Sequence, residues 1–141
     1  MSWGYFDMGK NMDFDFSKLK APTEAEEQTT LFYWASMKTG KYPELRLLHH
    51  IPNGGARRKS EAARLKAEGV KPGVPDIFLP VARGPWHGLF IELKRQKGGK
   101  VSDAQKNWIS DLLNQGYLAE VAYGWKEAAA LIEDYLDEKG V

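Results

Sequence analysis

The segment from Lys71 to Lys94 constrains the fold of this chain more than any other part of its 141 residues. It begins with Lys-Pro-Gly-Val-Pro at residues 71–75, a rigid turn that delivers Asp76 to the start of a short apolar strand. A proline closes this strand, and after a connection the apolar residues 89–94 predict a second strand. We therefore expect the two strands to pair as an antiparallel hairpin.

Two capping boxes predict where helices begin. Thr23 with Glu26 opens a helix that runs to about Lys38, and Ser102 with Gln105 opens a second helix. A strand that follows this second helix implies a right-handed crossover to a parallel neighbour. The other predicted elements are a strand over residues 45–51, a short basic helix over 58–68, a strand over 118–123 and a helix over 126–137. Together these elements predict an α/β fold with a mixed sheet flanked by helices.

Length and composition bound the class of protein. A chain of 141 residues forms one domain, and the absence of cysteine excludes disulfides, cysteine-based zinc sites, iron–sulfur clusters and thiol nucleophiles. The sequence contains no apolar stretch of membrane-spanning length and no signal-peptide pattern, so we expect a soluble, cytoplasmic protein with no membrane partner. Residues 1–20 mix aromatic and acidic side chains and predict an N-terminal arm, whose apolar residues need cover from the domain over 21–141 or from a second copy.

Positive charge is concentrated in the middle of the chain. The formal net charge is only +1, but residues 41–106 hold 14 Lys and Arg against 6 Asp and Glu. Such a segment favours a phosphate-binding surface, because phosphates that are neutralised release their condensed counterions. A solvated helix face rich in lysine explains the charge equally well, so charge alone does not decide between the two interpretations.

The second strand of the hairpin carries the residues from which chemistry can be predicted. Its alternation places Glu92 and Lys94 on one face, while the residues between them point into the core. Asp76 brings a second carboxylate near Glu92 if the hairpin pairs in register. Two carboxylates with a backbone carbonyl, here that of Leu93, form a hard oxygen site suited to Mg²⁺, and Lys94 can orient water or balance transition-state charge. The simpler interpretation is an ion pair on an edge strand.

Five short motifs follow one another in a distinctive order between residues 23 and 138. They are Glu-Ala-Glu-Glu-Gln at 24–28, His-Ile-Pro-Asn-Gly-Gly at 50–55, Gly-Val-Lys-Pro-Gly-Val-Pro-Asp at 69–76, Ile-Glu-Leu-Lys at 91–94 and Ser-Asp-Ala-Gln at 102–105. In order and spacing they resemble the VRR-NUC (virus-type replication-repair nuclease) family, a branch of the PD-(D/E)xK nuclease superfamily. The resemblance implies a restriction-endonuclease-like αβββαβ core. It also implies a site in which Mg²⁺, or Mn²⁺ in its place, is bound by Asp76 and Glu92, with Lys94 catalytic and Gln105 included.

The family completes its site with a glutamate from the first helix, and this chain offers three. Glu26 already belongs to the capping box. Glu24 shares one helical face with Leu31, so we expect it at the inward edge and choose it as the third metal ligand. Glu27 is nearly as good a candidate and stays open. Gln105 likewise has a second interpretation, as the capping partner of its own helix start, and both roles can hold.

Residues that border the predicted hairpin supply a candidate DNA-binding surface. The resemblance places His50 and Asn53 at the edge of the active-site cleft. These two residues also suggest an HNH-type nuclease, but the closing histidine of such a site is missing unless His87 serves. The basic residues that can contact phosphates are Arg57, Arg58, Lys59, Arg64, Lys66 and Lys71. Helix solvation explains most of these nearly as well.

By resemblance, the chain is expected to be a metal-dependent endodeoxyribonuclease that cuts phosphodiester bonds by water attack. Stand-alone members of the family resemble Holliday-junction resolvases, so branched DNA is the expected substrate and a homodimer the expected assembly. A bacterial or phage-infected cell is the expected setting, with a role in DNA repair or recombination. Two alternatives stay open, namely a nuclease that processes flaps or ends and a nucleic-acid-binding module that has lost catalysis.

Overall fold

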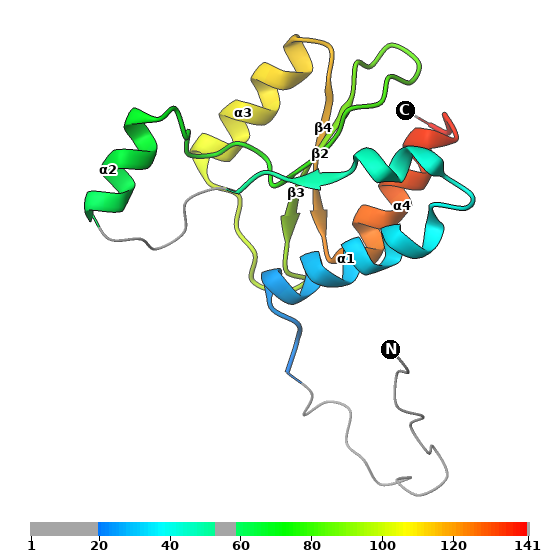
Figure 1. Ribbon diagram of the computed structural model, residues 1–141, viewed down its shortest axis with the longest axis horizontal. Helices are drawn as coiled ribbons and strands as arrows, with labels where there is room; N and C mark the ends of the chain where they lie inside the picture. Colours follow the sequence, from blue (N-terminus) through cyan, green and yellow to red (C-terminus); the bar gives the residue numbers. More distant parts are fainter. Residues whose placement is uncertain (1–19, 53–58, 141) are drawn as a thin grey trace, which may run out of the picture.

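The computed structural model describes residues 20–52 and 59–140 (Figure 1). Its helices are α1 (Glu24–Lys38), a short 3-10 helix (Pro43–Leu47), α2 (Lys59–Ala67), α3 (Asp103–Asn114) and α4 (Trp125–Leu136). Its strands are β1 (His49–His50), β2 (Ile77–Leu79), β3 (Leu89–Lys94) and β4 (Leu118–Tyr123). Of the arm predicted over residues 1–20, only Lys20 lies within the described residues. No helix in these two ranges is long and apolar enough to cross a membrane.

The four strands form one mixed sheet in the order β1-β2-β3-β4. β1, β2 and β3 pair antiparallel, and β4 runs parallel to β3, as the crossover through α3 predicts. In the β2–β3 pair, Ile77 lies opposite Ile91 and Phe78 lies opposite Phe90. This register brings Asp76, the residue before β2, level with Glu92. The predicted hairpin and the mixed sheet are confirmed.

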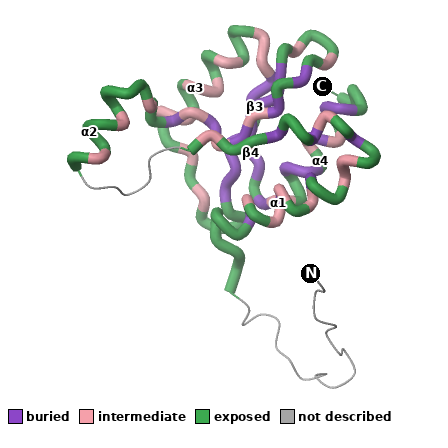
Figure 2. Tube along the Cα trace, in the orientation of Figure 1, coloured by how far each residue is buried: buried purple, intermediate pink, exposed green. Residues whose placement is uncertain are grey.

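The main core lies between one face of the sheet and the helices α1 and α4. Leu89, Ile91 and Leu93 of β3 are fully buried and belong to one apolar cluster with Leu31 of α1 and Ile132 of α4. Figure 2 shows this burial along the strands and on the inner sides of the two helices. Burial of each of these side chains contributes about 1.5–3 kcal/mol. The alternate residues of β3 face the other side of the sheet, where α3 packs against β4.

Both predicted capping boxes are present. The Thr23 hydroxyl accepts a hydrogen bond from the Glu26 amide at 3.1 Å, and α1 begins at the next residue. The Ser102 hydroxyl accepts from the Gln105 amide at 3.2 Å, and α3 begins in the same way. Each cap contributes about 1 kcal/mol and fixes the first turn of a helix that carries a predicted site residue.

The strand expected over residues 45–51 is wrong for most of its length. The 3-10 helix occupies its first half, and only the two residues of β1 join the sheet. The buried leucines are Leu45 and Leu48, three residues apart, whereas Leu47 is 50% exposed. A proline at the first position fixes the helical turn, and a spacing of three fits that turn better than the period of two. A period of two would place His49 on one face with Leu45, Leu47 and Ile51, but its side chain is exposed.

The turn before β2 packs closely against the start of α3. Gly73 has a φ of 91°, and a Cβ atom added there would lie 2.7 Å from the backbone carbon and oxygen of Ala104. Only glycine meets both demands at this position. The turn therefore fixes Asp76 relative to the first turn of α3, which carries Gln105.

We expect Gly73→Ala to destabilise the domain by about 2–4 kcal/mol, because the new methyl adds a backbone clash to the cost of a positive φ. Gly69→Ala is the matched control, since Gly69 has a φ of 98° and nothing lies within 4 Å of an added Cβ. This control is expected to cost only about 1–2 kcal/mol. Urea unfolding measures both losses, and equal values would contradict the importance of the close packing.

Candidate metal centre

Three carboxylates from three separate elements meet at one end of the sheet. Glu24 is the first residue of α1, Asp76 immediately precedes β2, and Glu92 lies in β3. Each offers one oxygen, and these oxygens all lie within 4.8 Å of one another. The register of the hairpin aligns Asp76 with Glu92, and the packing of α1 against β3 adds Glu24. Within residues 20–52 and 59–140, this is the single acidic or histidine group that could share a metal ion.

Glu92 is 1% exposed, and its two carboxylate oxygens differ in their surroundings. Oε1 accepts a hydrogen bond from Gln105 Nε2 at 2.7 Å and lies 3.4 Å from Lys94 Nζ. Oε2 is buried, and no donor from the described part of the chain contacts it. A buried oxygen without a partner costs about 1–3 kcal/mol. A divalent cation would satisfy this oxygen, because the three carboxylates supply the donors that hard cations prefer.

Asp76 is held in place through both its side chain and its backbone. Its Oδ2 accepts a hydrogen bond from the Leu93 amide at 3.0 Å. Its backbone carbonyl accepts from the Ile51 amide at 2.6 Å and lies 2.9 Å from Nδ1 of His50. Burial raises the pKa of the Asp76 carboxyl, and the hydrogen bond from Leu93 opposes this shift. Leu93 contacts Asp76 through its backbone amide. That the backbone carbonyl of Leu93 is a metal ligand stays a prediction.

Burial and charge act together on the protonation of Glu92. The pKa of its carboxyl is raised from 4.5 to about 8, chiefly by burial and further by the negative charge of Asp76, while Lys94 opposes the shift. In the metal-free protein this carboxyl therefore keeps its proton to a higher pH than an ordinary glutamate does. A cation that binds here displaces the proton, so metal affinity rises with pH.

Lys94 supplies the positive charge of the site. Its side chain is 9% exposed, and its Nζ lies beside Oε1 of Glu92 on the same face of β3, as the alternation predicts. Its backbone carbonyl accepts a hydrogen bond from the Gly124 amide at 2.8 Å, which ties the end of β3 to the end of β4. A buried ammonium is costly alone, and the neighbouring carboxylate offsets that cost.

Gln105 makes both of the contacts that its two interpretations require. Its Oε1 accepts a hydrogen bond from the Ser102 amide at 2.8 Å, which completes the capping box. Its Nε2 donates to Glu92 at 2.7 Å. One side chain therefore caps α3 and fixes the orientation of a predicted metal ligand.

The two glutamates left open by the sequence occupy different environments. Glu24 joins the acidic cluster, and burial raises the pKa of its carboxyl while Lys94 lowers it. Glu27 is 1% exposed and lies outside the cluster. Its carboxylate accepts hydrogen bonds from Trp125 N and Gln96 Nε2. The sequence analysis did not single out Gln96 or Trp125, because neither residue belongs to a local motif.

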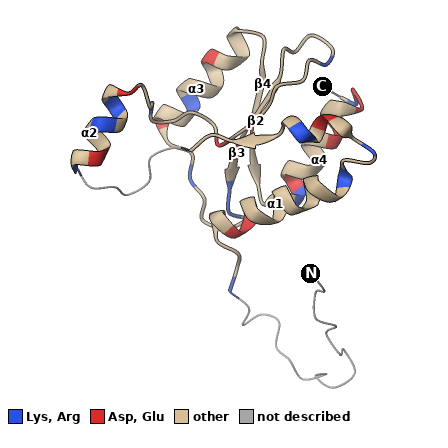
Figure 3. Cartoon of the chain, viewed as in Figure 1, with Lys and Arg blue, Asp and Glu red and all other residues tan. Residues whose placement is uncertain are grey.

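The candidate DNA-binding residues lie on both sides of the gap in the described chain. His50 contacts Asp76 next to the cluster, and Lys59 and Lys71 lie at the two ends of the segment that contains α2. No residue of α2 is buried, and Figure 3 shows basic and acidic positions along this helix, which lies apart from the sheet. Three other predicted contacts, Asn53, Arg57 and Arg58, lie outside the described residues. Two further basic residues of α2 are Arg64, which pairs with Glu68 at 3.1 Å, and Lys66.

The HNH interpretation is not supported by the position of His87. Its ring packs edge-on against Tyr117, beside Gly116. This is the end of the hairpin at which Leu79 pairs with Leu89, whereas His50 lies at the opposite end, beside Ile77. His50 and His87 therefore do not share a site.

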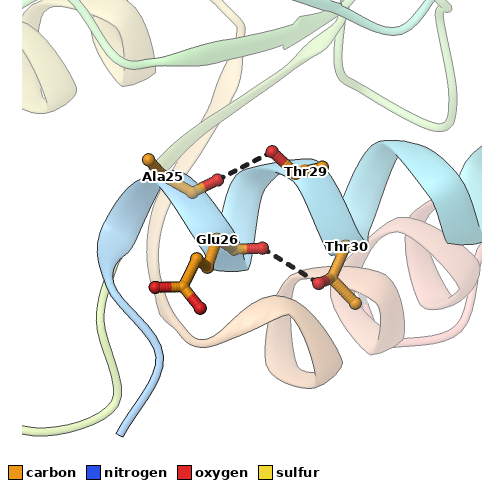
Figure 4. A pocket seen from close by; sticks show the side chains of 4 residues that line it. All are labelled: Ala25, Glu26, Thr29 and Thr30. Carbon is orange, nitrogen blue, oxygen red and sulfur yellow. Dashed lines mark hydrogen bonds between the residues drawn. The ribbon is translucent and has the colours of Figure 1, made fainter. Parts of the chain in front are cut away.

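A shallow hollow of about 410 Å³ lies along the first turns of α1 (Figure 4). It is lined by Ala25, Glu26, Thr29 and Thr30. The two threonine hydroxyls donate to the carbonyls of Ala25 and Glu26, and the Glu26 carboxylate takes part in the capping box. These polar groups are used within the helix, and none of the four lining residues belongs to the acidic cluster.

Comparisons with known proteins identify the family of the chain and its fold. The model of the VRR-NUC domain family matches residues 19–126. A solved structure named VRR_NUC domain protein is 36% identical, with a TM-score of 0.73 over 84% of this chain and 91% of that chain. No curated protein matches the sequence significantly. The chain belongs to the VRR-NUC family, a nuclease-like family, and both the predicted family and the predicted fold are confirmed.

In the metal-free protein, we expect stability to fall as the pH rises from about 4.5 to about 8, because folded Glu92 keeps its proton up to the raised pKa whereas the unfolded side chain loses it near 4.5. The folded state binds more protons in this window, so the free energy of unfolding decreases with pH. Glu92→Gln cannot ionise and should lose this part of the slope. Asp134→Asn changes an exposed acid on α4 and is the control, which should keep this part of the slope. Thermal unfolding at a series of pH values measures the slopes, and equal slopes for Glu92→Gln and the wild type would contradict the shift.

Proposed function

We propose that this protein is a metal-dependent endonuclease that hydrolyses phosphodiester bonds in DNA. The observation that carries the proposal is the cluster of Glu24, Asp76 and Glu92, in which a buried carboxylate oxygen is contacted by no donor from the described residues. Lys94 and Gln105 contact the same carboxylate through its other oxygen. Membership of a nuclease-like family supports the same chemistry.

The proposed cation is Mg²⁺, for which Mn²⁺ can substitute. Asp76, Glu92 and Glu24 would hold it, together with the Leu93 carbonyl, and all four donors are oxygens of the kind that hard cations prefer. When bound, such an ion acts as a Lewis acid on phosphoryl oxygen and lowers the pKa of water. The oxygen donor set supports the choice of a hard divalent cation.

The side chains of the protein have separate roles in the proposed hydrolysis. Lys94 places an ammonium beside the carboxylates, where it can orient the attacking water and stabilise negative charge that develops on the phosphate. Gln105 fixes Oε1 of Glu92 and leaves Oε2 free to bind the cation. In the overall reaction, a water oxygen bonds to phosphorus, the bond from phosphorus to one ester oxygen breaks, and a proton from the water ends on that oxygen, which leaves as a hydroxyl.

We further propose that the substrate is branched DNA and that a homodimer resolves Holliday junctions. A four-way junction presents two symmetric strands for cleavage, and each chain contributes one acidic cluster from its described residues, so a second copy supplies the second site. The proposed DNA contacts are His50, which lies beside Asp76, and Lys59 and Lys71 of the segment that contains α2, with Asn53, Arg57 and Arg58 from the sequence pattern. Such junctions arise where DNA is replicated and recombined, which in a bacterial or phage-infected cell is the cytoplasm.

We expect cleavage of a synthetic four-way junction in Mg²⁺ and its loss on addition of a chelator. Asp76→Asn and Lys94→Met should each lower the cleavage rate by about 100-fold or more, because each removes a group that acts on the reacting phosphate. The matched controls, Asp134→Asn and Lys126→Met, change exposed residues of α4 and should leave the rate unchanged. Cleavage that survives both site substitutions would overturn the assignment of the site.

The same assay compares junction, flap, free-end and duplex substrates. Faster cleavage of the junction supports the resolvase proposal, whereas faster cleavage of flaps or ends favours the flap-processing or end-processing alternative. Binding of all substrates without any cleavage in Mg²⁺ or Mn²⁺ would favour the non-catalytic module and contradict the enzyme proposal.

The proposed homodimer predicts a mass in solution of twice the chain mass of 15.9 kDa. Light scattering at the protein concentration of the cleavage assay, with and without junction DNA, measures this mass. A dimer that makes paired cuts at symmetric positions in the junction is the expected result. A monomer under both conditions would remove the dimer from the proposal and leave the nuclease site unaffected.

A further inference from the structure

Glu27 is a buried acid that the proposed reaction does not use. Its side chain is 1% exposed, and it lies one helical turn beyond Glu24 on α1. Oε2 accepts a hydrogen bond from the Trp125 amide at 2.6 Å, and Oε1 accepts from Gln96 Nε2 at 3.2 Å. Through these contacts, one carboxylate joins α1, the connection that follows β3, and the start of α4.

The start of α4 provides a favourable place for this carboxylate. Trp125 is the first residue of α4, and the preceding N-cap residue is Gly124, which has no side chain to accept a hydrogen bond from the helix amides. Glu27 takes over this capping role from a distant part of the chain. A carboxylate at the positive end of a helix is stabilised by the helix dipole, which helps to offset its burial.

The residues around this contact pack closely against Gly124. Gly124 has a φ of 88°, and a Cβ atom added there would lie 2.9 Å from Oε2 of Glu27 and 2.8 Å from Cγ of Gln96. The Gly124 amide also donates to the carbonyl of Lys94. The carboxylate of Glu27 therefore packs against Gly124, the residue whose amide is hydrogen-bonded to the backbone carbonyl of Lys94.

This network connects two members of the metal centre that lie on different elements. Glu24 precedes Glu27 by three residues, so the two side chains lie on neighbouring positions of one helix face. Lys94 precedes Gln96 by two residues at the end of β3. The position of the first turn of α1 relative to Lys94 is thus set by the hydrogen bonds of Glu27.

We propose that Glu27 is a positioning residue that holds Glu24 at the metal centre by tying α1 to the start of α4. This inference rests on the proposed function, because Glu24 is taken as a metal ligand. Glu27 itself does not contact the cation. Its loss lets the first turn of α1 move away from the sheet, and the site keeps Asp76 and Glu92 but loses its third carboxylate.

The test measures metal binding without DNA, by titration calorimetry with Mn²⁺ and by the rise in melting temperature with MgCl₂. Glu27→Ala is expected to weaken metal binding by about 10-fold, in the range found when groups that orient metal ligands are removed. Glu27→Gln is expected to restore binding to within about 2-fold, since its amide oxygen can accept from Trp125 while the Gln96 amide reverses. Gln96→Ala changes an exposed residue, keeps the contact with Trp125, and should give an intermediate loss.

A double-mutant cycle shows whether Glu27 acts through Glu24. If it does, Glu24→Gln combined with Glu27→Ala binds metal no more weakly than Glu24→Gln alone. Tyr135→Phe is the matched control for general destabilisation, because it removes a buried hydrogen bond to the Val81 carbonyl away from the metal centre. It should lower the melting temperature and leave metal binding unchanged.

The outcomes separate this inference from the proposed function. Additive losses in the double mutant would overturn the positioning role, and so would wild-type metal binding by both Glu27→Ala and Gln96→Ala. In either case, loss of metal binding in Asp76→Asn would show that the metal site itself stands. If Glu27→Ala does not fold, Gln96→Ala replaces it in the double-mutant cycle with Glu24→Gln. Additive losses, or wild-type metal binding by Gln96→Ala, would again overturn the positioning role. If the wild type binds neither Mn²⁺ nor Mg²⁺, the proposed function fails and the inference fails with it.

Discussion

Buried Glu92 and half-buried Asp76 lie side by side in this protein because β2 and β3 pair in one register. Ile77 opposite Ile91 aligns Asp76 with Glu92, and a slip of one residue would turn Glu92 toward the core. Mutual repulsion and burial both disfavour this arrangement in the absence of a cation, as the raised pKa of Glu92 records. The apolar face of β3, packed against α1 and α4, stabilises the strands against this cost.

Local signals account for the parts of the fold that could be predicted. The capping boxes at Thr23 and Ser102 depend on residues three apart, and the hairpin depends on a turn and two short apolar runs. The segment after α1 was not predictable in this way, because its leucines fit periods of two and three. Tertiary packing selected the period of three by burying Leu45 and Leu48 and leaving Leu47 exposed. The close approach of Gly73 to α3 likewise leaves no mark on the neighbouring sequence.

The candidate site, like the fold, could be predicted only in part from the sequence. Strand alternation alone put Glu92 and Lys94 on one face, and the turn put Asp76 at the mouth of the partner strand. The three glutamates of α1 could not be separated fully, since a helix start favours acids at every position of its first turn. Their different tasks depend on what lies opposite each one in the fold. For Glu27 the deciding partners come from the β3–α3 connection and from α4, which begins nearly one hundred residues later.

The double use of Gln105 has a consequence for how the protein moves. Helix ends open more often than helix centres, and the first turn of α3 is closed by the same side chain that orients Glu92. Whenever that turn frays, the carboxylate loses its anchor. The time for which Gln105 orients Glu92 is therefore bounded by the closed lifetime of one helix end, and a substitution that only stabilises this end would lengthen both.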